Sequence, residues 1–217
     1  SPPSILNLVA QSGSAFSSLL AKPGWLRDSR DSILWPTTGT KQSLTGEVAL
    51  PPADLRYYRI AYQHQRFFSV TRNLTFLIGG EADLAHGYGD KSLPQFKNFY
   101  AGGAGSVRGY DPSSLGPHDV DGSFLGGTRR LLGNAEVLFP MPGSGKDQSM
   151  RLSVFVDAGQ VYGEGQKLSL SDLRYSGGVG LTWISPFGPM KINLAYALNA
   201  KPEDKKQIFA FQLGQTF

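Results

Sequence analysis

The sequence predicts an all-β protein that crosses a membrane as an antiparallel β-barrel. Three observations lead to this fold class. Hydrophobic residues recur at every second position along most of the 217 residues, turn-forming residues interrupt that pattern at short intervals, and the two faces of the alternating segments differ in character. Apolar side chains occupy one face, with aromatic residues near the segment ends, whereas small, polar and charged residues occupy the other. Lipid-facing and lumen-facing residues alternate in this way in transmembrane barrels.

The N-terminal half contains four of about nine expected strands. Residues 15–30 join an apolar stretch to alternating charges, and residues 41–50, 56–65 and 73–84 alternate apolar with small or polar side chains. The turn VTRN (70–73) separates the last two segments. Glu81 and Asp83 share the polar face of one strand, where solvation in the lumen or ion pairing accounts for them.

The C-terminal half contains the other five expected strands, at 134–140, 151–159, 174–185, 190–198 and 208–217. In the second of these, Leu152, Val154 and Val156 share one face, while Ser153 and Asp157 lie on the other. Short connections such as SPFG (185–188) alternate with longer ones at 163–172 and 199–206. Outer-membrane barrels have short periplasmic turns and long outer loops, so the alternation suits that fold.

Composition narrows the class of protein further. No apolar run reaches the roughly 18 to 20 residues that a membrane-spanning helix needs, and the chain opens without the pattern of a signal peptide. The absence of cysteine excludes disulfides and thiolate metal sites. The net charge of +4 comes from scattered residues, which argues against nucleic-acid binding. A soluble β-sandwich also alternates, and the lipid-like character of the apolar face favours the barrel.

The loop FYAGGAGSVRGYDPSSLGP (99–117) is rich in glycine and carries a single arginine, Arg108. A guanidinium keeps its proton and offers a planar fork of donors to carboxylates, so it can fix a flexible loop to an acidic wall. The competing interpretation is a surface loop with a solvated arginine. The glycines miss the spacing of a phosphate-binding loop.

Several separated stretches together resemble one known family. They are GWLRDSRDSILWPTTG (24–39), NFYAGGAGSVRGYDPSSLGP (98–117), NAEVLFPMPG (134–143), VFVDAGQVY (154–162), LRYSGGVGLTWISPFGPMK (173–191) and a terminal strand that ends in an aromatic residue. In this order they resemble the BamA family of outer-membrane protein assembly factors, within the wider superfamily of barrel insertases and two-partner secretion transporters. The resemblance covers nearly the whole chain after about residue 15.

The resemblance implies a barrel of sixteen strands preceded by periplasmic POTRA domains. Residues 1–217 carry about nine strands and no POTRA domain, so we expect them to form the C-terminal part of such a barrel, with a long inward loop at about 91–125. Whether this part closes by itself is open.

The implied function is insertion of β-barrel proteins into the bacterial outer membrane, without enzymatic activity or a cofactor. The implied partners are membrane lipid, unfolded outer-membrane clients and accessory lipoproteins. A two-partner secretion or TamA-like translocation pore is the alternative within the superfamily, and a passive porin is the alternative outside it.

The resemblance also assigns roles to individual residues. It implies that the loop arginine Arg108 forms a salt bridge in the lumen with Glu136 and Asp157, both of which have inward parity in their strands. The flanking motif residues are Val107, Gly109 and Tyr110. We expect no catalytic residue and no metal ligand, and His64, His86 and His118 lack ligand spacing.

The C-terminal strand carries the second implied site. Gln212, Gly214 and Phe217 fit the polar, glycine and terminal-aromatic positions of the family's C-terminal signal. In the family this strand closes the barrel against the first strand, and the resemblance implies a loose seam at which a client strand can be added. The alternative is that Gly214 only relieves crowding in a barrel wall.

Overall fold

The computed structural model describes residues 17–52, 54–143 and 149–214. Ten strands form one antiparallel sheet in the order β1-β3-β4-β5-β7-β8-β9-β10-β12, and β2 also pairs with β3. Their bounds are β1 (Leu19–Ala21), β2 (Gly24–Asp28), β3 (Gly39–Leu50), β4 (Tyr57–Thr71), β5 (Leu74–Gly87), β7 (Arg129–Pro140), β8 (Met150–Tyr162), β9 (Arg174–Ser185), β10 (Gly188–Ala197) and β12 (Phe209–Leu213). The predicted all-β antiparallel fold is confirmed.

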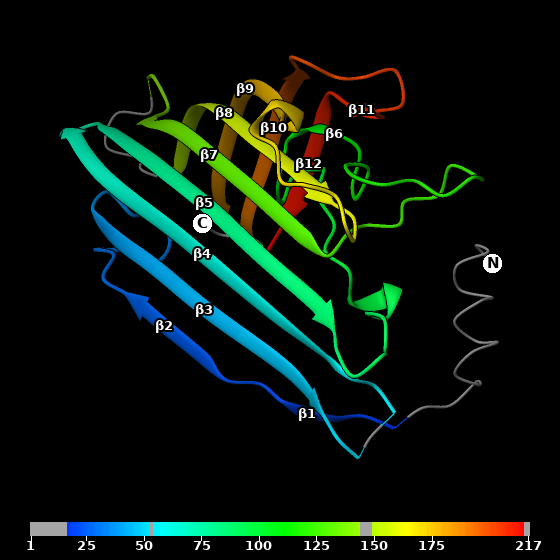
Figure 1. Ribbon diagram of the computed structural model, residues 1–217. Helices are drawn as coiled ribbons and strands as arrows, with labels where there is room; N and C mark the ends of the chain where they lie inside the picture. Colours follow the sequence, from blue (N-terminus) through cyan, green and yellow to red (C-terminus); the bar gives the residue numbers. More distant parts are fainter. Residues whose placement is uncertain (1–16, 53, 144–148, 215–217) are drawn as a thin grey trace.

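The sheet is curved and open. Figure 1 shows it curling around the long segment that carries the short strand β6 (Gly109–Tyr110), so the sheet has a concave and a convex face. Within the described residues, the strands at its two ends, β1 with β2 and β12, are not paired with each other. The chain thus forms part of a barrel wall rather than a closed barrel.

The first expected strand, at 15–30, is divided in the structure. Pro23 lies between β1 and β2, and both short strands pair with β3. A proline has no N–H to donate to a ladder, so the strand breaks there. The Pro23 carbonyl instead accepts a hydrogen bond of 2.8 Å from Gly46 N–H, which keeps the chain against β3.

Other boundaries also differ from the expected ones. β4 continues to Thr71 and β7 begins at Arg129, because hydrogen bonding extends a strand beyond the residues whose alternation is clear. In the described residues the C-terminal strand ends at Leu213. The unpredicted elements are the 3₁₀ turns η1 (Gln95–Lys97) and η2 (Leu170–Asp172) and a two-stranded ribbon of β6 with β11 (Lys206–Gln207).

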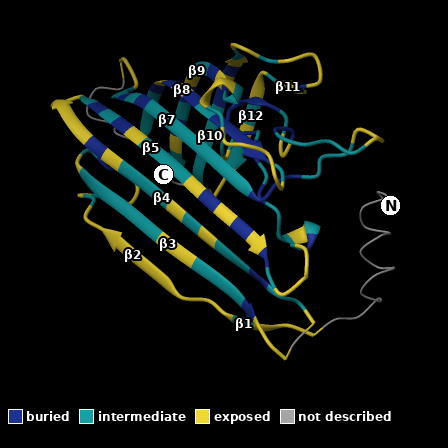
Figure 2. Ribbon diagram, in the orientation of Figure 1, coloured by how far each residue is buried: buried dark blue, intermediate teal, exposed yellow. Residues whose placement is uncertain are grey.

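Burial alternates along the strands with the predicted period. Figure 2 shows exposed and buried residues following each other along the C-terminal part of β5. In β8, Val154 and Val156 are each 50% exposed, whereas Ser153 and Asp157 are buried. The polar face is therefore the enclosed one, which reverses the arrangement of a water-soluble sheet and agrees with lipid contact on the convex face.

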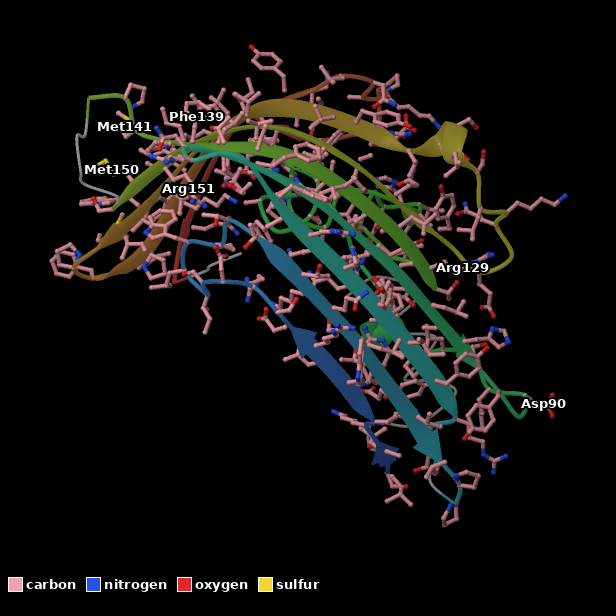
Figure 3. The ribbon with its side chains drawn as sticks, turned by 90° about the vertical axis from the view of Figure 1, so that its left-hand side faces the viewer. Asp90, Arg129, Phe139, Met141, Met150 and Arg151 are labelled. Atoms are coloured by element: carbon pink, nitrogen blue, oxygen red, sulfur yellow. The ribbon has the colours of Figure 1, made fainter. Side chains whose placement is uncertain are left out.

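The two rims of the sheet differ in the length of their connections. Asp90 and Arg129 mark one rim in Figure 3, and Phe139, Met141, Met150 and Arg151 mark the other. The connections at the Asp90 rim span 51–56, 88–128, 163–173 and 198–208, and those at the Arg151 rim span 29–38, 72–73, 141–149 and 186–187. The expected alternation of short and long connections is present after β4.

Residues 88–128 pack against the concave face. Ala101, Val107, Tyr110 and Leu115 form a buried cluster with Val161 of β8. A second cluster joins Phe67, Leu77 and Leu138 from three neighbouring strands. None of the helices in the described part of the chain has the length and apolarity needed to span a membrane.

Candidate functional site: an arginine in the concave face

Glycines shape the segment that carries Arg108. Gly102 and Gly109 have φ values of +110° and +89°, a region that other residues rarely adopt. A Cβ on Gly102 would lie 2.3 Å from the Asp111 carbonyl oxygen, and one on Gly109 would lie 3.2 Å from the backbone nitrogen of Ala197. Glycine thus permits both the turn and the close approach to β10.

The arginine itself is enclosed by the wall. Its side chain is 5% exposed, and it donates from Nε and Nη2 to the two carboxylate oxygens of Asp157, each at 2.7 Å. The backbone N–H of Arg108 also donates to Asp157 Oδ2 at 3.0 Å, and Nη1 donates to Glu136 Oε2 at 3.2 Å. The paired, planar contact with Asp157 is the geometry that lysine cannot reproduce.

Neighbouring strands supply further contacts that sequence reasoning did not identify. The Phe155 ring lies beneath the guanidinium, with Arg108 Cζ 3.2 Å from the ring centroid. Asn134 Nδ2 donates to Asp157 Oδ1 at 2.9 Å. Phe155 and Asn134 stand two residues from Asp157 and Glu136 respectively, so the two-residue period placed them on the same face as the acids.

The pKa of Arg108 follows from these contacts. Burial alone would lower the pKa, but the carboxylates of Asp157 and Glu136 outweigh burial and raise the pKa above its ordinary value. The guanidinium therefore stays charged, and the cluster cannot be relieved by loss of its proton.

The residues that flank Arg108 are fully buried. Val107 packs closely on β8, because a Cβ on Gly159 would lie 2.6 Å from Val107 Cγ2. The Tyr110 hydroxyl donates to the Tyr175 carbonyl oxygen at 3.1 Å. Burial and the nearby Asp204 carboxylate raise the pKa of Tyr110 to about 12, so its hydroxyl remains a donor.

Two more arginines form ion pairs at the ends of this region. Arg130 Nε lies 2.5 Å from Asp83, and its Nη2 lies 2.8 Å from Glu81, so ion pairing accounts for the two acids on that strand. Arg130 Nη1 also donates to the Tyr100 carbonyl oxygen at 2.9 Å. On the other side, Arg174 of β9 pairs at 2.5 Å with Asp204, which lies in the connection that carries β11.

The three C-terminal positions singled out in the sequence differ in their surroundings. Gln212 lies on β12 opposite Lys191, and it lines the same cavity of about 370 Å³ as Arg108, Glu136 and Asp157. Gly214 follows the last residue of β12 with a φ of +80°, and its N–H donates to the Pro189 carbonyl oxygen at 2.8 Å. The third position, Phe217, lies outside the described residues.

The residues around Arg108 are arranged to anchor the loop rather than to catalyse a reaction. Among residues 17–52, 54–143 and 149–214, no group of three or more His, Cys, Asp and Glu side chains is placed to hold a metal ion. The acids around Arg108 already accept hydrogen bonds from it. What this geometry can do is fix residues 99–117 to β7 and β8.

Comparison with known proteins identifies the family. Residues 4–217 match the Omp85 superfamily domain. The chain is 43% identical, over 89% of its length, to an outer membrane protein assembly factor BamA of Neisseria meningitidis, of which it covers 28%. It is 29% identical, over 92% of its length, to the BamA of Nitratidesulfovibrio vulgaris, of which it covers 26%.

The fold gives the same result. The crystal structure of BamA from Haemophilus ducreyi lacking POTRA domains 1–3 superposes with a TM-score of 0.82 and 26% identity, over 88% of this chain and 41% of that one. The chain thus spans little more than a quarter of the two curated bacterial relatives. With the family match extending from residue 4 to the last residue, the chain belongs to the Omp85 superfamily.

Proposed function

We propose that these 217 residues form the C-terminal part of the barrel of an insertase, which assembles β-barrel proteins into the bacterial outer membrane. Two bacterial relatives are named outer membrane protein assembly factors, and the Bos taurus relative is named a homologue of sorting and assembly machinery component 50. These names favour assembly over the translocation pore. A wall with an apolar convex face suits residence in a lipid bilayer.

The paired contact between Arg108 and Asp157 carries this proposal. It fixes residues 99–117 across the concave face, where they occupy space that an open porin would leave to water. Arg108, Glu136 and Asp157 act as a loop lock, and Val107, Gly109 and Tyr110 fit the loop to the wall. The lock maintains the barrel shape in which clients are inserted, and none of its residues catalyses a reaction.

The strand β12 is the proposed place of client contact. Within the described residues it pairs only with β10, through five opposed residue pairs. An edge strand presents free N–H and C=O groups that can template another strand. Burial of the client's strands in lipid supplies the driving force, and membrane lipid, unfolded clients and accessory lipoproteins are the proposed partners.

The test is the rate of client insertion by the full-length protein carrying Arg108→Ala. Heat-dependent migration in a gel reports whether the barrel itself has folded. Arg72→Ala is the matched control, because Arg72 is an exposed residue in the tight turn between β4 and β5. We expect Arg108→Ala to reduce insertion strongly while the barrel still forms, and Arg72→Ala to insert normally.

Two outcomes would contradict the proposal. Normal insertion by a folded Arg108→Ala variant would remove the lock from the assembly mechanism. Normal insertion together with lost export of a secreted partner would make the protein a translocation pore instead.

A further inference from the structure

The two carboxylates of the loop lock are not held equally. Asp157 accepts four hydrogen bonds, three from Arg108 and one from Asn134. Glu136 accepts one from Arg108, at 3.2 Å and through Oε2. Its other oxygen, Oε1, is buried and has no hydrogen-bond partner among the described residues. Arg108 therefore satisfies Asp157 but engages Glu136 through one oxygen only.

A lysine from a distant strand reaches this second oxygen. Lys191 of β10 places Nζ 3.9 Å from Glu136 Oε1, and the Glu136 side chain is only 2% exposed. One guanidinium facing two carboxylates leaves one negative charge over, and Lys191 supplies the matching positive charge. A buried carboxylate without such a partner is strongly unfavourable.

The wall between the two residues lets the lysine side chain cross. Glu136 lies on β7 and Lys191 on β10, so β8 and β9 separate them in the sheet. Ser153 of β8 lies opposite Gly180 of β9, and Gly180 lies opposite Asn193 of β10. A Cβ on Gly180 would approach Ser153 Oγ to 2.6 Å. Small residues on β8 and β9 therefore leave room for the lysine side chain above the surface of the sheet.

We propose that Lys191 is a positioning residue of the loop lock, which neutralises Glu136 and ties the lock to the C-terminal hairpin. Lys191 lies opposite Gln212 in the ladder between β10 and β12. The ion pair thus links the loop to the strand neighbouring the proposed client-contact strand. This inference rests on the proposed loop lock.

The test measures how accessible the loop is in the full-length protein. Ser114→Cys supplies the reporter, because Ser114 lies fully buried in the same loop, so that maleimide reaches a cysteine there only when the loop moves, and the 217 residues contain no other cysteine. The rate of maleimide labelling in isolated membranes is compared for Lys191→Met, Lys191→Arg, Glu136→Gln and the double variant Lys191→Met with Glu136→Gln. Lys41→Met is the control, since Lys41 lines the same cavity from β3.

We expect Lys191→Met to label about fivefold faster than the parent, and Lys191→Arg and Lys41→Met to stay within about twofold of it. The double variant should return towards the parental rate, because removing both charges leaves the balanced pair of Arg108 and Asp157. Parental labelling by Lys191→Met, or simple addition of the two single effects in the double variant, would overturn the inference.

Folding and the wider proposal are tested separately. If Lys191→Met fails to fold in the heat-modifiability gel, recovery of folding in the double variant supports charge compensation, and equal failure of both overturns it. Arg108→Ala is labelled in parallel. If it does not accelerate labelling, the loop lock itself is wrong, whereas acceleration by Arg108→Ala without acceleration by Lys191→Met removes only the role of Lys191.

Discussion

The loop around Arg108 and the C-terminal strand β12 line the same cavity but are held in opposite ways. Val107 and Tyr110 are fully buried, and the arginine between them contacts two strands through charged hydrogen bonds. In β12, Phe209 and Phe211 are about half exposed, and the described residues give the strand one neighbour. The loop is therefore firmly anchored, whereas the edge strand β12 is held by few contacts.

This difference indicates a division of labour within one wall. Paired charges in an enclosed space impose one geometry, because each charged group is left buried without compensation when its partner moves. A short edge strand held by one ladder opens at low cost and can exchange partners. The anchored loop keeps the wall in shape, and the edge strand is the part that can change.

The largest expected effect comes from removing the main partner of Arg108. Asp157→Ala leaves the guanidinium buried and removes three hydrogen bonds of Arg108, two from the guanidinium and one from the backbone N–H, so we expect the free energy of unfolding to fall by about 3 to 5 kcal/mol. Urea titration of the full-length protein in detergent measures it. Asp121→Ala, in an exposed loop, is the control, and a loss below about 1 kcal/mol for Asp157→Ala would show that the lock is not tight.

Backbone hydrogen exchange compares the two regions directly. The amides of β8 lie between two neighbouring strands, whereas those of β12 have β10 alone within the described residues. We expect the β12 amides to exchange about a hundredfold faster than the inner amides of β8, a difference of about 2.7 kcal/mol in opening free energy. Equal protection in the full-length protein would show that the closing strand holds β12 firmly and would remove the contrast.

A glycine pair tests whether the loop needs its special backbone. Gly109→Ala places a methyl group 3.2 Å from the Ala197 nitrogen and keeps a φ of +89°, so we expect a loss of about 1 to 2 kcal/mol in unfolding free energy. Gly105→Ala is the matched variant, because a Cβ there meets nothing within 4 Å. The two variants should differ in the same urea titration. Similar stability of both would mean that the loop adjusts its path.

Much of the fold could be predicted because the strands alternate with a strict period of two. That period also placed Glu136 and Asp157 on the enclosed face, and the resemblance paired them with Arg108. Pro23 was visible in the sequence as well, but the alternation on either side of it concealed the break between β1 and β2. The ribbon of β6 and β11 was not predictable, because two-residue strands carry no periodic pattern.

The contact of Lys191 shows where sequence reasoning stops. Its parity placed it on the enclosed face, yet its distance from Glu136 depends on register across four strands and on the small residues between them. Register follows from tertiary pairing, and the hydrophobic pattern fixes it only to a shift of two residues. A charged side chain can therefore be assigned to a face from sequence, whereas its partner cannot.

The smallest expected effect concerns Gly214, where the two interpretations of the C-terminal glycine diverge. No atom of the described residues lies within 4 Å of a Cβ built there, so among them crowding is not what excludes a side chain, and the φ of +80° is what disfavours one. Gly214→Ala should then lower the free energy of unfolding by no more than about 1 kcal/mol.

If the left-handed turn after β12 serves the seam, the same variant should slow client insertion measurably although stability scarcely changes. Gly165→Ala is the matched control, because Gly165 also has positive φ and open space but lies in the connection between β8 and β9. Equal insertion rates for the two variants would reduce Gly214 to an ordinary turn glycine, and β12 would then contribute its edge without the bend that follows it.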